Sequence, residues 1–263
     1  MPGWIQRLLR VGERTSGVPP SANGASSFHL RWEITGRFRS AEVTLEVVEP
    51  PQVAALHFWA LQADFAERSG RHRGGAHLGL QWFPPHPAST AVNWGGYDDT
   101  GRELAGTDST LPSATGNPNT RDLPWRPGTA YRLRIERAGG SSTEAAWSGS
   151  VTELGPDRRT PVGPVTEVRR LLVPGGVEIT GCAVWSEVFA RCDDPTVVVR
   201  WSDPEVVGVD GRRATPTAVT TSYQTHQDGG CANTDSSVDG VGLVQRTAVR
   251  RVSPPGTRLG VPS

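Results

Sequence analysis

Residues 54–82 read A-A-L-H-F-W-A-L-Q-A-D-F-A-E-R-S-G-R-H-R-G-G-A-H-L-G-L-Q-W, and this stretch decides the fold. Two alternating runs flank a glycine-rich turn, which predicts a long β-hairpin. In the first run, one side is apolar except for a histidine: Ala55, His57, Trp59, Leu61, Ala63 and Phe65. The other side begins apolar and ends polar: Leu56, Phe58, Ala60, Gln62 and Asp64. The return run separates Ala76, Leu78, Leu80 and Trp82 from His77, Gly79, Gln81 and Phe83.

Four polar side chains, Gln62, Asp64, His77 and Gln81, share one face if these two runs pair. The turn between the runs is too long to fix their register. Buried polar groups need hydrogen-bond partners or solvent, so we expect this face to form a cleft with Trp94 and Trp125 as its walls.

The rest of the chain alternates in the same way. Residues 28–35 and 131–137 each predict a strand with one buried side, and Gly181 marks a bulge in residues 177–189. Residues 4–11 are expected to form a short edge strand. No amphipathic helix of normal length is found, so we predict an all-β antiparallel sandwich or jelly roll. The expected organisation is a main domain over 1–203, with strands of 204–263 packed on the same sandwich before a tail.

Composition excludes several classes of partner. The 27 basic and 27 acidic residues cancel, which argues against nucleic acid. No apolar run is long enough to cross a membrane. The N-terminus lacks the apolar region of a signal peptide, which predicts a cytoplasmic protein or a secreted one whose leader has been removed. Of the three cysteines, Cys182 is expected to be a buried thiol, and Cys192 and Cys231 could pair in an oxidising compartment.

A long segment, 95–128, is poor in apolar periodicity, as functional or mobile loops often are. Aromatic walls with a few polar groups are typical of ligand sites, and sugars stack on such rings. The aromatic candidates are Trp82, Trp94, Tyr97 and Trp125, and the polar candidates are Gln62, Asp64, Gln81, Asn93 and Asp98. An equally good alternative is that Trp94 and Trp125 only pin the long segment to the sheet.

Catalytic and metal-binding patterns are weaker. Retaining glycosidases need two carboxyl groups about 5–5.5 Å apart. Asp64 and Glu67 point to opposite sides of a strand, and no E-x-D-x-x-E pattern occurs. Calcium ligands could come from Asn93, Asp98, Asp99 and Asp108, but turn formation explains these residues better. We therefore expect no metal and no cofactor.

Four passages in order resemble a bacterial family known as domain of unknown function 3472. They are G-A-H-L-G-L-Q (75–81), the tryptophan-containing stretch 93–98, L-P-W-R-P-G-T-A-Y-R-L (123–133) and V-W-S-E-V-F (184–189). The resemblance covers about residues 54–201. It implies a concanavalin-like sandwich of the kind found in polysaccharide-related bacterial proteins, and it supplies no catalytic residues.

These observations lead to one main expectation, a non-catalytic, lectin-like protein whose partner is a glycan. Two alternatives remain: a polysaccharide-active hydrolase, which the carboxylate spacing weakens, and a structural or protein-interaction sandwich with no small ligand. The sequence does not decide whether the chain is an enzyme.

Overall fold

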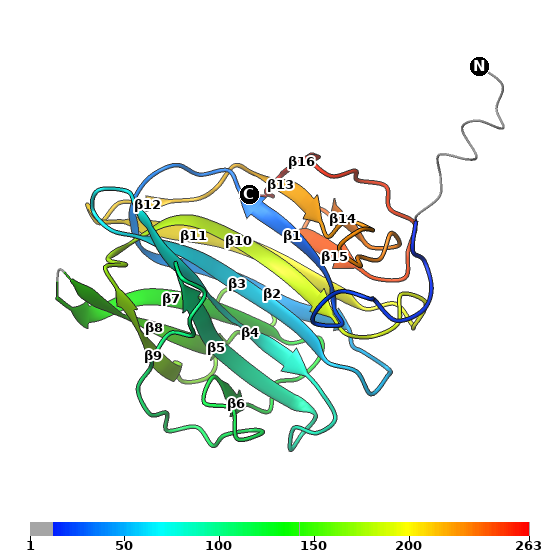
Figure 1. Ribbon diagram of the computed structural model, residues 1–263, viewed down its shortest axis with the longest axis horizontal. Helices are drawn as coiled ribbons and strands as arrows, with labels where there is room; N and C mark the ends of the chain where they lie inside the picture. Colours follow the sequence, from blue (N-terminus) through cyan, green and yellow to red (C-terminus); the bar gives the residue numbers. More distant parts are fainter. Residues whose placement is uncertain (1–12, 142, 263) are drawn as a thin grey trace.

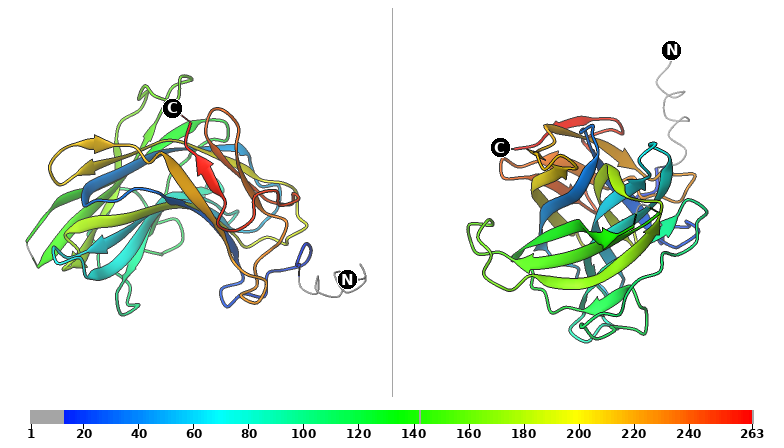
Figure 2. Two further views of the ribbon diagram at one scale, coloured as in Figure 1. Left: turned by 90° about the horizontal axis from the view of Figure 1, so that it is seen from above. Right: turned by 90° about the vertical axis from the view of Figure 1, so that its left-hand side faces the viewer.

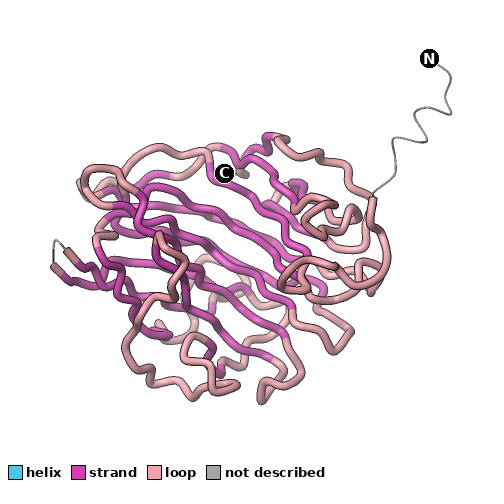
Figure 3. Tube along the Cα trace, in the orientation of Figure 1, coloured by secondary structure: helices cyan, strands magenta, loops and turns pink. Residues whose placement is uncertain are grey.

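The computed structural model describes residues 13–141 and 143–262, and these contain strands and loops but no helix (Figure 3). None of the described residues therefore forms a helix that could span a membrane. The edge strand expected over residues 4–11 lies outside the described part of the chain.

Strand pairing divides the fold into two antiparallel layers, seen in Figure 1. The first sheet follows the order β16 (Arg258–Gly260), β13 (Ala218–Tyr223), β1 (Ser26–Trp32), β10 (Glu178–Val188), β3 (His57–Ala66), β4 (His72–Trp82), β5 (Thr90–Asp98) and β6 (Thr120–Asp122). The second follows β14 (Asp235–Val238), β15 (Leu243–Arg246), β11 (Val198–Gly208), β2 (Phe38–Glu49), β7 (Ala130–Gly140), β8 (Glu144–Glu153) and β9 (Thr166–Pro174), with β12 (Arg213–Ala214) on β11. One residue pair, Ile179 with Phe38, joins the two sheets.

The predicted hairpin is confirmed as β3 and β4. Its register pairs Gln62 with His77 and Phe58 with Gln81. The bulge predicted at Gly181 is also confirmed, because the register of β10 against β3 shifts between Ile179 and Gly181. Together with the absence of helices, these pairings establish an all-β sandwich.

One apolar core fills the space between the sheets. Trp59, Leu61 and Leu78 enter it from the first sheet, and Leu133 and Ile135 from the second, all exposing 1% or less of their surface. Alternation places these side chains together because successive residues of a strand point to opposite faces. The inward faces predicted for residues 55–65 and 131–135 are therefore correct.

The long segment after β5 is held against the sandwich. Its main chain runs along the edge of β9, where the Thr107 N–H donates to the carbonyl of Arg170 and the Leu172 N–H to that of Ala105, at 2.9 and 2.8 Å. Arg169, which exposes 5% of its surface, donates to the carbonyl of Pro118 and to Asn119 Oδ1. Part of this segment thus covers a sheet edge, which would otherwise present unpaired backbone groups.

The four C-terminal strands complete both layers. Figure 2 shows them, orange to red, gathered at one side of the molecule, where β13 and β16 extend the first sheet and β14 and β15 the second. A disulfide between Cys192 and Cys231 joins the loop after β10 to the loop before β14. Cys182 is a buried free thiol in the core, as predicted.

Candidate functional site

The two outward-facing surfaces of the sandwich differ in chemistry. On the second sheet, charged side chains pair with one another. Glu46, for example, lies 3.0 Å from an Arg158 nitrogen and 2.7 Å from an Arg200 nitrogen. On the first sheet, a small apolar cluster stands on the side away from the core, made of Phe58, Ala60 and Trp185. These three side chains expose 4%, 0% and 7% of their surface, so this outer face has a small buried cluster of its own, separate from the main core.

The outer face is built from adjacent strands in fixed register. Its rows across β10, β3 and β4 are Gly181–Asp64–Gly75, Ala183–Gln62–His77, Trp185–Ala60–Gly79 and Glu187–Phe58–Gln81. The four polar residues predicted to share a face therefore do so. Glycine and alanine at the neighbouring positions leave room for the large rings above them.

Three rings meet over the small residues of β3 and β4. The ring centroids of Phe58 and Trp185 lie 5.0 Å apart, those of His77 and Trp185 5.6 Å, and those of Phe58 and His77 5.5 Å, all close to perpendicular. Edge-to-face packing of this kind is favourable for aromatic groups. The indole N–H of Trp185 is buried and has no hydrogen-bond partner among the described residues. A ligand oxygen could accept that hydrogen bond.

Polar groups surround the rings. Gln62 donates a hydrogen bond of 2.8 Å from Nε2 to Asp64 Oδ1, which fixes the amide beside His77. At the far end of the face, Asn23 Nδ2 donates to Glu187 Oε1 at 2.8 Å. The face thus offers amide, imidazole and carboxyl groups within reach of one aromatic cluster.

Burial sets the charge of the titratable groups on this face. It lowers the pKa of His77 to about 4, and burial followed by the charge of Arg31 lowers the pKa of His29 to about 4 as well. Both imidazoles are therefore neutral at pH 7. Burial raises the pKa of Glu187, and the hydrogen bond from Asn23 opposes that rise. Glu187 therefore holds its proton to a higher pH than an ordinary glutamic acid.

The prediction that Trp94 and Trp125 form the walls of a cleft is wrong. Trp94 is fully buried in the core, and its indole N–H donates to the carbonyl of Trp147. Trp125 exposes 3% of its surface and donates to the carbonyls of Gln81 and Ala91. Both rings pack into the sandwich because a large apolar side chain is stabilised most by full burial. The alternative that they pin neighbouring segments to the sheet is the one the structure supports.

The remaining candidates lie around the edge of the outer face. Asn93 is on the same face but is 7% exposed, and its amide donates to Thr120 Oγ1. Tyr97 is 55% exposed and pairs in register with Gly75. Asp98 closes a turn by accepting hydrogen bonds from the backbone N–H groups of Thr100 and Arg102. Asp98 thus has the turn-forming role that its sequence context favoured.

Alternation in the sequence placed Phe58 on this face, but sequence reasoning missed Trp185 and Glu187. Trp185 and Glu187 join only because β10 is the neighbour of β3, a pairing between segments more than a hundred residues apart. No group of three or more histidine, cysteine, aspartate or glutamate side chains is arranged to hold a metal ion in the described ranges.

Comparisons with known proteins give fold-level similarity alone. No protein-family model matches the chain, and no curated protein sequence is similar to it. A solved structure of scytalido-glutamic peptidase with a peptide-based transition state analog is 15% identical, with 84% of this chain and 98% of that chain covered and a TM-score of 0.46. An alginate lyase of family PL-14 from Aplysia kurodai is 8% identical, with 59% and 70% covered and a TM-score of 0.27.

A second peptidase, SCP-B of the Eqolisin family, is 14% identical over the same shares of the two chains, 84% and 98%, with a TM-score of 0.40. These neighbours include enzymes that act on polysaccharide and on peptide. Identities and TM-scores this low carry no argument about which activity, if any, this chain has.

Proposed function

We propose that the outer face of the first sheet binds a polysaccharide chain. The observation that carries this proposal is the cluster of Phe58, Trp185 and His77 on the side away from the core, bordered by the amide and carboxyl of Gln62 and Asp64. Sugar rings present apolar C–H faces to aromatic groups and hydroxyls to amides and carboxylates. The aromatic cluster would therefore contact the sugar ring, and the amide and carboxyl groups would bind its hydroxyls.

The uncharged imidazoles of the face favour a neutral segment of the polymer beside them. His77 and His29 carry no charge at pH 7, and Gln62 satisfies one oxygen of Asp64. The unpaired indole N–H of Trp185 supplies a further donor. A hydroxyl placed there would remove the cost of leaving a buried donor without a partner.

The test is binding to a panel of neutral polysaccharides, followed by titration calorimetry with an oligosaccharide of any that binds. Gln62→Ala and His77→Ala should each weaken binding about tenfold, the effect of losing roughly 1.4 kcal/mol. Arg134→Ala, on the outer face of the second sheet, is the matched control and should leave affinity unchanged. Binding that is equal in the wild type and His77→Ala, or no binding to any polysaccharide, would refute the proposal.

A second candidate function, cleavage of the bound chain, is favoured by Glu187. A glutamic acid whose pKa is raised by burial is suited to donate a proton to a leaving group. Asp64 cannot serve as the second carboxylate for Glu187. Asp64 pairs with Gly181, six residues along β10 from Glu187, so the two acids are about 20 Å apart at the rise of a strand. This excludes the two-carboxylate arrangement for Asp64 and Glu187.

Cleavage would appear as new reducing ends when the protein is incubated with a polysaccharide that it binds. Glu187→Gln, which keeps the size of the side chain and its contact with Asn23, should abolish that signal while binding persists. Equal release by Glu187→Gln and the wild type would remove Glu187 from the reaction. No release by either protein leaves binding as the function.

A further inference from the structure

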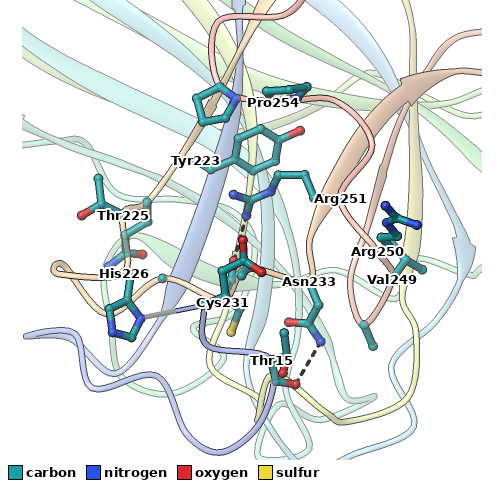
Figure 4. A pocket seen from close by; sticks show the side chains of 16 residues that line it. Thr15, Tyr223, Thr225, His226, Cys231, Asn233, Val249, Arg250, Arg251 and Pro254 are labelled. Atoms are coloured by element: carbon teal, nitrogen blue, oxygen red, sulfur yellow. Dashed lines mark hydrogen bonds between the residues drawn. The ribbon is translucent and has the colours of Figure 1, made fainter. Parts of the chain in front are cut away.

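A hollow lies beside the C-terminal strands. It has a volume of about 1010 Å³ and is bordered by Thr15, Tyr223, His226, Arg250 and Arg251 (Figure 4). We call it the C-terminal groove. Gln224 also lines it, and the same side chain accepts a hydrogen bond from the backbone of Ser27, the residue paired with Glu187. The groove therefore adjoins the Glu187 end of the outer face.

Arg251 is the group that distinguishes this groove. Its guanidinium carbon stands 3.8 Å from the centre of the Tyr223 ring, a cation–π contact. It donates from Nε to the Thr234 carbonyl and from Nη2 to the Cys231 carbonyl, both at 2.9 Å, and from Nη2 to Thr234 Oγ1 at 3.0 Å. No carboxylate lies within 4.0 Å of it in the described ranges. A half-buried cation is thus held by neutral acceptors alone.

The nearby acids do not pair with it. One oxygen of Asp235 accepts from the backbone N–H groups of Val252 and Ser253, each at 2.9 Å. Glu13 lines the groove but forms no ion pair with Arg250 or Arg251 within the described residues. The side chains that line the groove include two arginines and one glutamate, so arginines outnumber acids in the lining.

The walls of the groove are already fixed. The Cys192–Cys231 disulfide ties one of its segments to the loop after β10, and Asn233 Nδ2 donates to the carbonyls of Cys192 and Thr15 at 2.6 and 3.2 Å. The Cys231 N–H donates to Ser26 Oγ at 2.8 Å. A site whose groups are positioned in advance loses less entropy when a ligand binds.

We propose that the C-terminal groove binds the carboxylate of an acidic sugar residue, with Arg251 and Arg250 as its recognition groups. Arg251 keeps the two N–H groups of Nη1 for a carboxylate oxygen, because Nε and Nη2 already donate to protein oxygens. The exposed Arg250 can offer both nitrogens of its fork to the two oxygens of the same carboxylate. The assignment of the ligand as a sugar rests on the proposed function. The assignment of the charged group rests on the unpaired arginines.

The probes are a tri-uronate and a neutral trisaccharide of the same linkage, titrated calorimetrically at 20 and 200 mM NaCl. The tri-uronate should bind, more weakly at the higher salt, because screening reduces interactions between exposed charges. Arg250→Ala should weaken it about tenfold, and Arg251→Gln should weaken it at least as much. Arg212→Ala, an exposed arginine in the turn between β11 and β12, is the matched control and should bind as the wild type does.

Three results would overturn the proposal: no binding of the tri-uronate, equal binding of the neutral trisaccharide at the groove, or unchanged affinity in Arg250→Ala. Arg250 is exposed, so this variant is informative even if Arg251→Gln proves unstable. Tri-uronate binding should persist in His77→Ala. If neutral polysaccharides do not bind but the tri-uronate does, in an Arg250-dependent way, the groove stands and the outer-face proposal fails.

Discussion

Reduction of the Cys192–Cys231 disulfide should destabilise this protein substantially. The bond closes a loop with a sequence separation of 39. In the chain-entropy description, a loop of about 40 residues restricts the unfolded chain by about 13 cal/mol/K, which is about 4 kcal/mol at 25 °C. The bond also sits where three irregular segments meet, because the Cys192 carbonyl accepts from Asn233 and the Cys192 N–H donates to the carbonyl of Gly17. Little regular pairing supports those segments when the bond is open.

The measurement is urea unfolding of the wild type and of the Cys192→Ser, Cys231→Ser double variant, each with and without a reductant. The reductant should lower the midpoint of the wild type to that of the double variant and leave the double variant unchanged. Thiol labelling of the denatured protein supplies a count: one reactive cysteine, Cys182, before reduction and three after it. Equal midpoints for the wild type in both conditions, with three thiols counted in each, would show that the bond does not form.

Two further predictions concern the core and the response to pH. Leu133→Ala should lower the free energy of unfolding by about 2–5 kcal/mol because it opens a cavity at a fully buried position. Arg134→Ala, one residue further along the same strand, should lower it by less than about 1 kcal/mol. Denaturant melts measure both changes, and a loss under about half a kilocalorie for Leu133→Ala would contradict the packing. Burial lowers the pKa of His57 to about 4 and thereby favours its neutral form in the folded protein, so stability should fall as pH drops from about 6.5 towards 4, by up to about 1.4 kcal/mol per pH unit for this residue. His57→Gln should remove the share of His57 and make the dependence shallower, while the shares of His29 and His77 remain. An unchanged slope would mean that His57 titrates normally.

Much of the fold followed from alternation in the sequence. The hairpin of β3 and β4, the inward side of each and the bulge at Gly181 are local properties, since each depends on residues that are close in the chain. The shared face of Gln62, Asp64, His77 and Gln81 followed for the same reason. Once β3 and β4 pair, their outward residues must lie together.

The sequence predictions about the site failed for two reasons. Trp94 belongs with Val92 on the buried side of β5, and alternation alone would have shown this, but its position beside the long segment suggested a wall instead. Trp185 and Glu187 could not be placed, because no local signal indicates that β10 runs beside β3. The pairing of distant strands depends on the whole set of strands competing for partners.

The position of β10 also determines when the first sheet can form. β1 and β3 flank it on either side, so the two N-terminal strands cannot be joined until residues 178–188 have left the ribosome. Until then the edges of β1 and β3 that will pair with β10 are unpaired. Unpaired edges can hydrogen-bond to strands of other chains, which leads to aggregation. Closure of the first sheet is therefore a late, long-range event of the kind that makes β-rich proteins fold slowly. Productive synthesis of this protein should depend on keeping those early strands apart from other chains until the second half arrives.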